Sequence, residues 1–186
     1  MISESYKNKL RELAGIEHKY YRAIDTFIGD NVILEPAGMY ERIGDNEEPV
    51  FQAGEHAISD EEETCASKYL GGAAMGAFSA RNMGAKETNT FYVYEINEAP
   101  DKDISWWSSE DFMFLAEVRF RRSVPAKYIG KIILNEHQEK MLSCWYEFYS
   151  SDPYDEDDDV ESRCEEFMVG DFDDYVLQEL KKIKLS

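Results

Sequence analysis

One feature of the sequence restricts the possible folds more than any other. A long segment with helical spacing lies between segments that have the composition of strands. In residues 60–82 the apolar and small side chains recur at helical intervals, and Ser59 or Asp60 stands where an N-cap belongs. Residues 18–24 and 91–96 are rich in aromatic and β-branched side chains, which favour strands. A helix among strands of this kind predicts the α+β class.

Residues 112–122 alternate with period two, which predicts a further strand. Val118 and Phe120 fall on its apolar face, whereas Glu117 falls on the other face beside Arg119 and Arg121. The C-terminal part of the chain predicts more regular structure. It comprises a strand at 128–134, a helix or a strand pair at 136–149, and a helix at 172–183 with Asp171 as its N-cap.

The chain has 186 residues, of which 43% are hydrophobic. A chain of this length buries one substantial core and leaves little for a second full domain. We therefore expect one domain over residues 1–150 and an acidic C-terminal extension over 151–186 that ends in a short helix.

The net charge of −19 restricts the classes of partner. Nucleic acids and anionic membranes would be repelled at long range, so neither is expected to bind. A basic protein partner or a protein acceptor fits this charge better. The basic run Arg119, Arg121, Arg122, Lys127 and Lys131 either offsets the repulsion of an anionic substrate or forms a solvated face.

Cysteine usage and the N-terminal sequence bear on the compartment. The three cysteines, Cys65, Cys144 and Cys164, are odd in number and widely spaced, which predicts a reducing cytosol. No signal peptide and no stretch of about 20 apolar residues is recognised, so we expect a soluble, cytoplasmic protein unless a specialised secretion route exports it. No spacing of Cys and His predicts a metal site.

Several short motifs follow one another in an informative order. They are Tyr21-Arg22-Ala23, Ala57-Ile58-Ser59 ahead of the predicted helix, the strand at 91–96 with Ala99-Pro100, and Glu117-Val118 ahead of Val124-Pro125. Together they resemble the Arg, Ser-Thr-Ser and Glu-x-Glu elements of the cholera-toxin-like mono-ADP-ribosyltransferases, in the order of that family.

The resemblance implies a fold, a substrate and a set of roles. The fold would be ADP-ribosyltransferase-like, with two packed, mostly antiparallel β-sheets forming an NAD cleft with flanking helices. NAD would be the substrate, and ADP-ribose would move to a protein acceptor, as in toxins and effectors. Arg22, with Tyr21 and Ala23, would hold the phosphates, Ser59 would orient the catalytic carboxylate, and Glu117 would stabilise the oxocarbenium-like ribose.

Two positions depart from the family pattern. Leu115 stands where the first Glu of Glu-x-Glu belongs, and Ala57 stands where the first Ser belongs. Since that first Glu usually activates an arginine acceptor, the resemblance implies NAD hydrolysis or a non-arginine acceptor here.

Plainer interpretations remain beside the enzymatic one. Arg22 could pair with an acid such as Asp25, Glu117 could be a cross-strand ion-pair partner, and Ser59 could be only an N-cap. The alternative functions are a catalytically lapsed protein on the same fold, or an acidic antitoxin or immunity-type protein. The latter would bind a basic partner through the acidic surface of residues 152–174.

Overall fold

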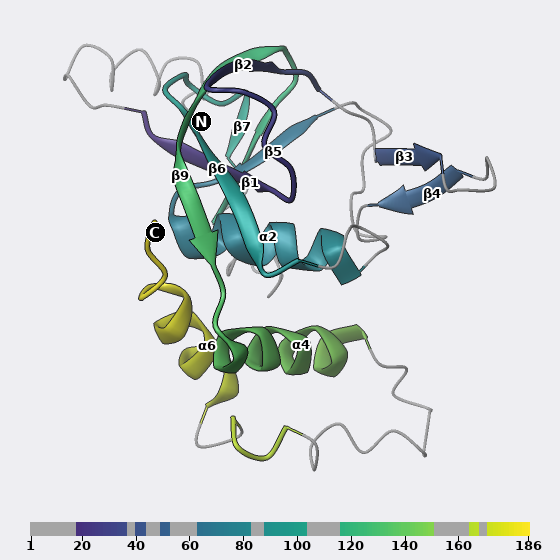
Figure 1. Cartoon of the computed structure of the whole chain (residues 1–186), viewed down its shortest axis with the longest axis vertical. Coiled ribbons are helices and arrows are strands. Elements are labelled where there is room, and N and C mark those ends of the chain that lie inside the picture. The colour runs from purple at the N-terminus through teal and green to yellow at the C-terminus, as the bar shows by residue number, and fades with distance from the viewer. Residues whose placement is uncertain are drawn as a thin grey trace, which may run out of the picture.

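The computed structural model describes residues 18–36, 40–43, 49–52, 63–82, 88–103, 116–150, 164–167 and 171–186. They form an antiparallel sheet with helices on one side, which confirms the α+β prediction (Figure 1). The strands are β1 Tyr20–Ile24, β2 Asn31–Leu34, β3 Tyr40–Ile43, β4 Pro49–Gln52, β5 Thr64–Ser67, β6 Thr90–Ile96, β7 Lys102–Asp103, β8 Glu117–Phe120 and β9 Val124–Ile133; the helices are α2 Leu70–Asn82, α4 Glu136–Ser150 and α6 Phe172–Leu180.

The principal sheet has seven strands in the order β2-β9-β6-β1-β5-β8-β7, and each neighbouring pair is antiparallel. Strands β3 and β4 pair only with each other in a separate two-stranded sheet. The described strands therefore do not form the two packed sheets that we expected. The reason is that β1 pairs with both β6 and β5, which joins the two halves into one sheet.

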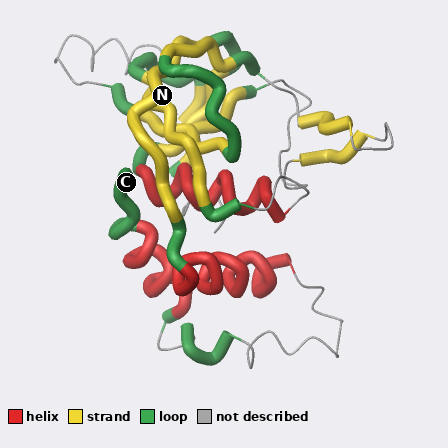
Figure 2. The backbone as a smooth tube through the Cα atoms, in the orientation of Figure 1, coloured by secondary structure: helices red, strands yellow, loops and turns green. Residues whose placement is uncertain are grey.

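Helix α2 lies between the sheet and the helix pair α4 and α6 (Figure 2). Its residues 70–78 are all apolar or glycine, as expected of a helix that is covered on both faces. Ala74, Met75 and Phe78 of α2 belong to a core that also contains Val93 of the sheet and Trp145 of α4.

The C-terminal helix belongs to this same core. Phe172, Val176 and Leu180 of α6 are buried in it. Gly71 allows α6 to approach α2 closely, because a Cβ atom at this glycine would lie 2.1 Å from the backbone oxygen of Leu180. The C-terminal extension predicted at 151–186 therefore ends in a helix that helps to fill the main core.

The other face of the sheet buries a second core that includes Tyr20, Ala66, Tyr94, Val118 and Phe120. The sheet curls around this core, since residues from strands far apart in the order meet inside it. A hydrogen bond of 2.9 Å from the Thr64 hydroxyl of β5 to the Glu35 carbonyl, just after β2, closes the curl.

The start of α2 differs from the sequence prediction. The helix begins at Leu70 rather than at residue 60, and Ser59 and Asp60 are therefore not its N-cap. Residues of β5 extend along β8 in this region, with Cys65 opposite Arg119 and Ala66 opposite Val118. Sheet pairing thus overrides the helical spacing of the first part of this segment.

The later elements agree more closely with the sequence. Residues 136–150 form a helix, which decides between the two predicted structures. Asp171 caps α6 by accepting a hydrogen bond of 3.1 Å from the Asp174 amide, as predicted. Helix α6 ends at Leu180 rather than at residue 183.

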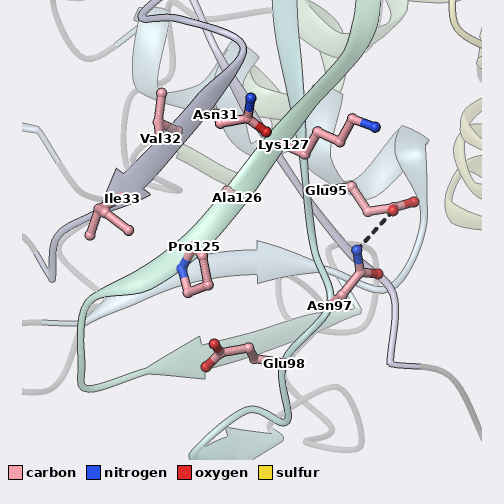
Figure 3. A pocket seen from close by; sticks show the side chains of 9 residues that line it. All are labelled: Asn31, Val32, Ile33, Glu95, Asn97, Glu98, Pro125, Ala126 and Lys127. Carbon is pink, nitrogen blue, oxygen red and sulfur yellow. Dashed lines mark hydrogen bonds between the residues drawn. The ribbon is translucent and has the colours of Figure 1, made fainter.

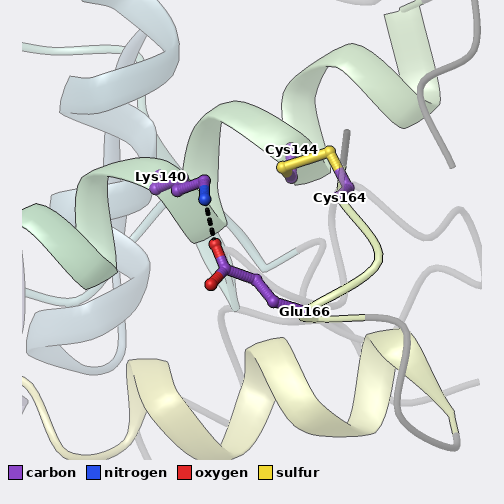
Figure 4. The surroundings of a disulfide bond; sticks show 4 residues. All are labelled: Lys140, Cys144, Cys164 and Glu166. Atoms are coloured by element: carbon purple, nitrogen blue, oxygen red, sulfur yellow. Dashed lines mark ion pairs between the residues drawn. A yellow bond between two sulfur atoms is a disulfide. The ribbon is translucent and has the colours of Figure 1, made fainter. Parts of the chain in front are cut away.

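A disulfide joins Cys144 of α4 to Cys164 in the turn at 164–167 (Figure 4). The two Cα atoms are 5.7 Å apart, although the residues are 20 apart in sequence. The ion pair between Lys140 and Glu166 lies beside the disulfide. Two of the three cysteines are therefore paired, which their wide spacing did not predict, because the fold brings together residues that are far apart in sequence. The reducing compartment stays a prediction.

Candidate functional site

Glu117 is the first residue of β8 and lies in a buried ion-pair cluster. Its Oε1 accepts a hydrogen bond of 2.7 Å from Nε of Arg119, and Nη1 of Arg119 donates to Glu63 at 2.9 Å. Arg121 donates to the other oxygen of Glu63 at 3.0 Å. Glu117, Arg119 and Glu63 are each at most 7% exposed. The predicted alternation, with Glu117, Arg119 and Arg121 on one face, is confirmed from residue 117 onward.

The charges of this cluster stabilise one another. Burial raises the pKa of Glu63, but the hydrogen bonds from Arg121 and Arg119 outweigh it and hold that pKa below its usual value. Burial lowers the pKa of Arg119. Its interactions with Glu117 and Glu63 have a larger effect and raise this pKa above its usual value. Glu63 and Arg119 are therefore charged at neutral pH, and the hydrogen bond from Arg119 fixes the position of the Glu117 side chain.

The backbone next to Glu117 is also unusual. Ala116 has a φ of 45°, and it is the non-glycine residue with positive φ in the described part of the chain. Its carbonyl accepts a hydrogen bond of 3.2 Å from the Lys68 amide. A left-handed alanine costs about 1 kcal/mol, and such strain concentrates at functional sites.

A row of polar residues crosses the sheet and ends at Glu117. In successive strands Lys127 is opposite Glu95, Glu95 is opposite Tyr21, Tyr21 is opposite Ser67, and Ser67 is opposite Glu117. Residues directly opposite in antiparallel strands point to the same face. The row therefore places the predicted residues Tyr21 and Glu117 on one face, and its four strand spacings span roughly 19 Å.

Arg22 approaches the same place from the other face. It is opposite Tyr94, which is buried in the second core, so its side chain leaves the strand on that side. Strand β1 pairs with β5 where Tyr21 is opposite Ser67. The same two strands are joined by a hydrogen bond of 2.7 Å from Nη1 of Arg22 to the Cys65 carbonyl. Burial lowers the pKa of Arg22, and electrostatic interactions with Cys65 and Glu117 oppose this shift in part. The guanidinium thus bridges β1 and β5 within electrostatic reach of Glu117.

Cys65 adds a thiol to this group. Part of the residue is exposed, but burial of the thiol group, together with the nearby Glu117 carboxylate, raises its pKa to about 12. A hydrogen bond with Glu117 contributes to the same shift. Cys65 is therefore a protonated donor to the Glu117 carboxylate at neutral pH.

Ser67 is the hydroxyl residue that sequence reasoning missed. It is 3% exposed, its Oγ accepts a hydrogen bond of 3.2 Å from the Tyr69 amide, and it is directly opposite Glu117. Ser59, which was predicted to orient Glu117, lies outside the described residues, as do Ala57 and Leu115. The signal that could have identified Ser67 was its place just before the small-residue helix, in the strand-forming segment Thr64–Ser67.

The other predicted residues have structural partners. Ala23 is buried in the core beneath α2 and does not join the polar row. Arg122 of the basic run pairs with Asp101 at 2.6 Å and with Glu98 at 3.2 Å. Since Arg119 and Arg121 pair with Glu63, much of the predicted positive island is neutralised by carboxylates.

A pocket of about 480 Å³ lies at the opposite end of the polar row, between the ends of β2, β9 and β6 (Figure 3). Val32, Ile33 and Pro125 give it an apolar side. Glu95 gives it a polar side and accepts a hydrogen bond of 3.0 Å from the Asn97 amide (Figure 3). The face that carries Glu117 therefore also carries an open pocket, at the far end of the polar row.

Two further features of the described residues bear on function. No group of three or more His, Cys, Asp or Glu side chains among them could hold a metal ion. No helix among them is long and apolar enough to cross a membrane. Comparison of the chain with protein-family models, with curated proteins and with solved structures found no match.

Proposed function

We propose that the protein is an NAD-dependent mono-ADP-ribosyltransferase that moves ADP-ribose to a protein acceptor other than arginine or to water. The observation that carries the proposal is the polar row in which Tyr21, Ser67 and Glu117 share one face of the sheet beside Arg22. Three residue types of the family motifs are thereby close together, although they are far apart in the sequence.

The chemistry requires a fixed carboxylate. When the bond between ribose and nicotinamide breaks, its electron pair leaves with nicotinamide and the ribose gains oxocarbenium character. Glu117, fixed by Arg119, would stabilise this positive charge and hold a ribose hydroxyl. Water or an acceptor nucleophile then bonds to the anomeric carbon and releases its proton.

The neighbouring residues have supporting roles in this proposal. Ser67 and the Cys65 thiol orient Glu117, in the place of Ser59. Arg22 leaves β1 on the other face, so its role in this proposal is to hold the Cys65 carbonyl and to act on Glu117 through its positive charge. The fold is proposed to be a variant of the ADP-ribosyltransferase type, because the strand with Arg22, the strand before α2 and the strand with Glu117 are neighbours in the order β1-β5-β8.

Nicotinamide release from labelled NAD by the full chain tests the proposal, with and without a cell lysate that supplies acceptors. Glu117→Gln should lower turnover at least about a hundred-fold, since it removes the charge opposite the oxocarbenium ion. Ser67→Ala should lower it less. Glu165→Gln is the matched control, because Glu165 is exposed and lies outside the site. Turnover that survives in Glu117→Gln, or absence of turnover in the native protein, would reject the proposal.

A binding protein on the same fold is the second candidate. The observation that favours it is the ion-pair cluster itself, which gives Glu117 and Glu63 structural partners without any substrate. In that case Glu117→Gln would lower the melting temperature of the protein, and NAD would not change the melting temperature of either form.

A further inference from the structure

The two edges of the seven-stranded sheet differ in their protection against other strands. Strand β7 at one edge has only two residues, both charged, and Asp103 of β7 pairs with Lys68 at 2.7 Å. Short length and charge are the usual means by which natural proteins prevent pairing at an edge. Strand β2 at the other edge reads Asn-Val-Ile-Leu and has neither a charge nor a proline. This edge lacks the usual protection.

An exposed apolar side chain lies within β2 itself. Ile33 is 57% exposed, whereas the exposed Phe27 just before β2 packs on Tyr92 and Tyr128 of the neighbouring strands. Ile33 is opposite Pro125 of β9, and both line the pocket described above (Figure 3). Among the residues that the structure describes, β2 pairs only with β9. Within the described part of the chain, the outer side of β2 therefore has no strand partner, and the apolar Ile33 and Pro125 lie beside it.

The charge around this edge restricts what can bind there. Asp30 and Glu35 flank β2 directly; Glu95, Glu98 and Lys127 line the pocket, and Arg122 pairs with Glu98, so the acids at β2 and Glu95 outnumber the cations. A second copy of the chain would bring another net charge of −19 to an edge that is already flanked by acids. An extended segment with basic residues would instead be attracted to the flanking carboxylates.

We propose that the β2 edge binds an extended segment of a basic partner protein, which adds to the sheet as an eighth strand. Its backbone pairs with β2, alternate apolar side chains pack on Ile33 and Pro125, and its lysine or arginine side chains reach Glu35 and Glu95. This interaction does not depend on NAD chemistry, so it stands whether or not the protein is a transferase.

The test uses the full chain and a synthetic peptide, Lys-Arg-Val-Thr-Ile-Thr-Val-Lys, with binding measured by titration calorimetry. Ile33→Lys should weaken binding at least about ten-fold, because it adds a like charge and removes the apolar contact. Ile133→Lys is the matched control, since Ile133 is 44% exposed on β9 and belongs neither to β2 nor to the pocket. Equal effects of the two substitutions would overturn the proposal.

Backbone methylation of the peptide tests strand pairing directly. Only one alternate set of peptide amides faces β2, so N-methylation of that set should abolish binding and methylation of the other set should preserve it. Amide signals of residues 31–34 should shift on binding. Shifts confined to the acidic residues after 150, equal binding of both methylated peptides, or dimerisation of the protein through Ile33 at high salt would each overturn the proposal.

Discussion

Single side chains of the β8 strand decide the electrostatics of the candidate site. Arg119 lies between the carboxylates of Glu117 and Glu63, and all three side chains are buried. A buried pair of this kind tolerates the loss of one partner poorly, because the remaining charge stays buried without compensation. The cluster therefore fixes Glu117, and it also makes the stability of the protein depend on pH.

Glu63→Gln should lower the free energy of unfolding at pH 7 by about 2 kcal/mol, since it removes a carboxylate that accepts from two arginines. The pKa of Glu63 is lowered from 4.5, so its stabilisation is complete above that pH and is lost as the pH falls through the folded-state pKa. Urea unfolding measures the free energy of unfolding of both proteins. The difference between Glu63→Gln and the native protein should be smaller at pH 3 than at pH 7. A difference that is the same at both pH values would contradict this assignment; Glu165→Gln is the control.

Cys65 should react slowly with iodoacetamide in the folded protein. With its pKa raised to about 12, the thiolate fraction at pH 8 is small, and we expect alkylation at least about a hundred-fold slower than in the unfolded chain. Mass spectrometry of timed samples measures the rate. Glu117→Gln should accelerate it by removing the adjacent negative charge; an unchanged rate would show that Glu117 does not act on the thiol.

At the scale of elements, the junction between β5 and α2 organises the site. Strand β5 connects β1 to β8, and α2 begins three residues after Ser67 and packs on β1 and β5. The N-terminal end of α2 is in turn held by α6, whose backbone at Leu180 lies against Gly71. The position of β5, and hence of Ser67 and Cys65, therefore depends on the contact between two helices.

The substitution Gly71→Ala distinguishes the effect of helix propensity on stability from the effect of packing. Propensity alone predicts a gain of about 1 kcal/mol, because alanine is a better helix former than glycine. The close backbone of Leu180 predicts a loss of roughly 1 to 3 kcal/mol, since the backbone of α6 must move to admit a methyl group. We expect the loss to dominate in thermal and urea unfolding. A stabilised variant would show that α6 does not approach α2 this closely.

For the whole molecule, the C-terminal segment closes the core. Phe167 in the turn at 164–167 is fully buried, and α6 contributes Phe172, Val176 and Leu180 to the core around α2. The Ser186 amide donates a hydrogen bond of 2.8 Å to the Lys131 carbonyl of β9. The chain therefore returns to the sheet at its end, and the disulfide between Cys144 and Cys164 holds the turn to α4.

Reduction of this disulfide should destabilise the protein globally. The bond closes a loop between residues 20 apart, which stabilises the fold by about 3 kcal/mol and corresponds to a melting-temperature decrease of roughly 10 °C on reduction. Scanning calorimetry with and without a phosphine reductant measures this decrease in melting temperature. Cys144→Ser with Cys164→Ser should reproduce the decrease, while Cys65→Ser should still respond to reductant. Equal melting temperatures in both conditions would contradict a structural role for the bond.

The sequence by itself determined the elements whose signal is local. The strand at 91–96, the alternation of Val118 and Phe120 against Glu117 and Arg119, and the Asp171 cap follow from side-chain period and capping chemistry. It also identified Tyr21, Arg22 and Glu117 as residues of interest. Each of these inferences needs only a few neighbouring residues.

Only the tertiary structure decided the features that depend on pairing between distant residues. The start of α2 at Leu70 rather than at residue 60 follows from the pairing of β5 with β8. The choice of Ser67 as the hydroxyl opposite Glu117 depends on that register, and the disulfide depends on the close approach of α4 and the turn after it. The free energy of strand pairing comes from contacts between segments that are far apart in sequence. The periodicity of a single segment therefore does not predict which strands pair.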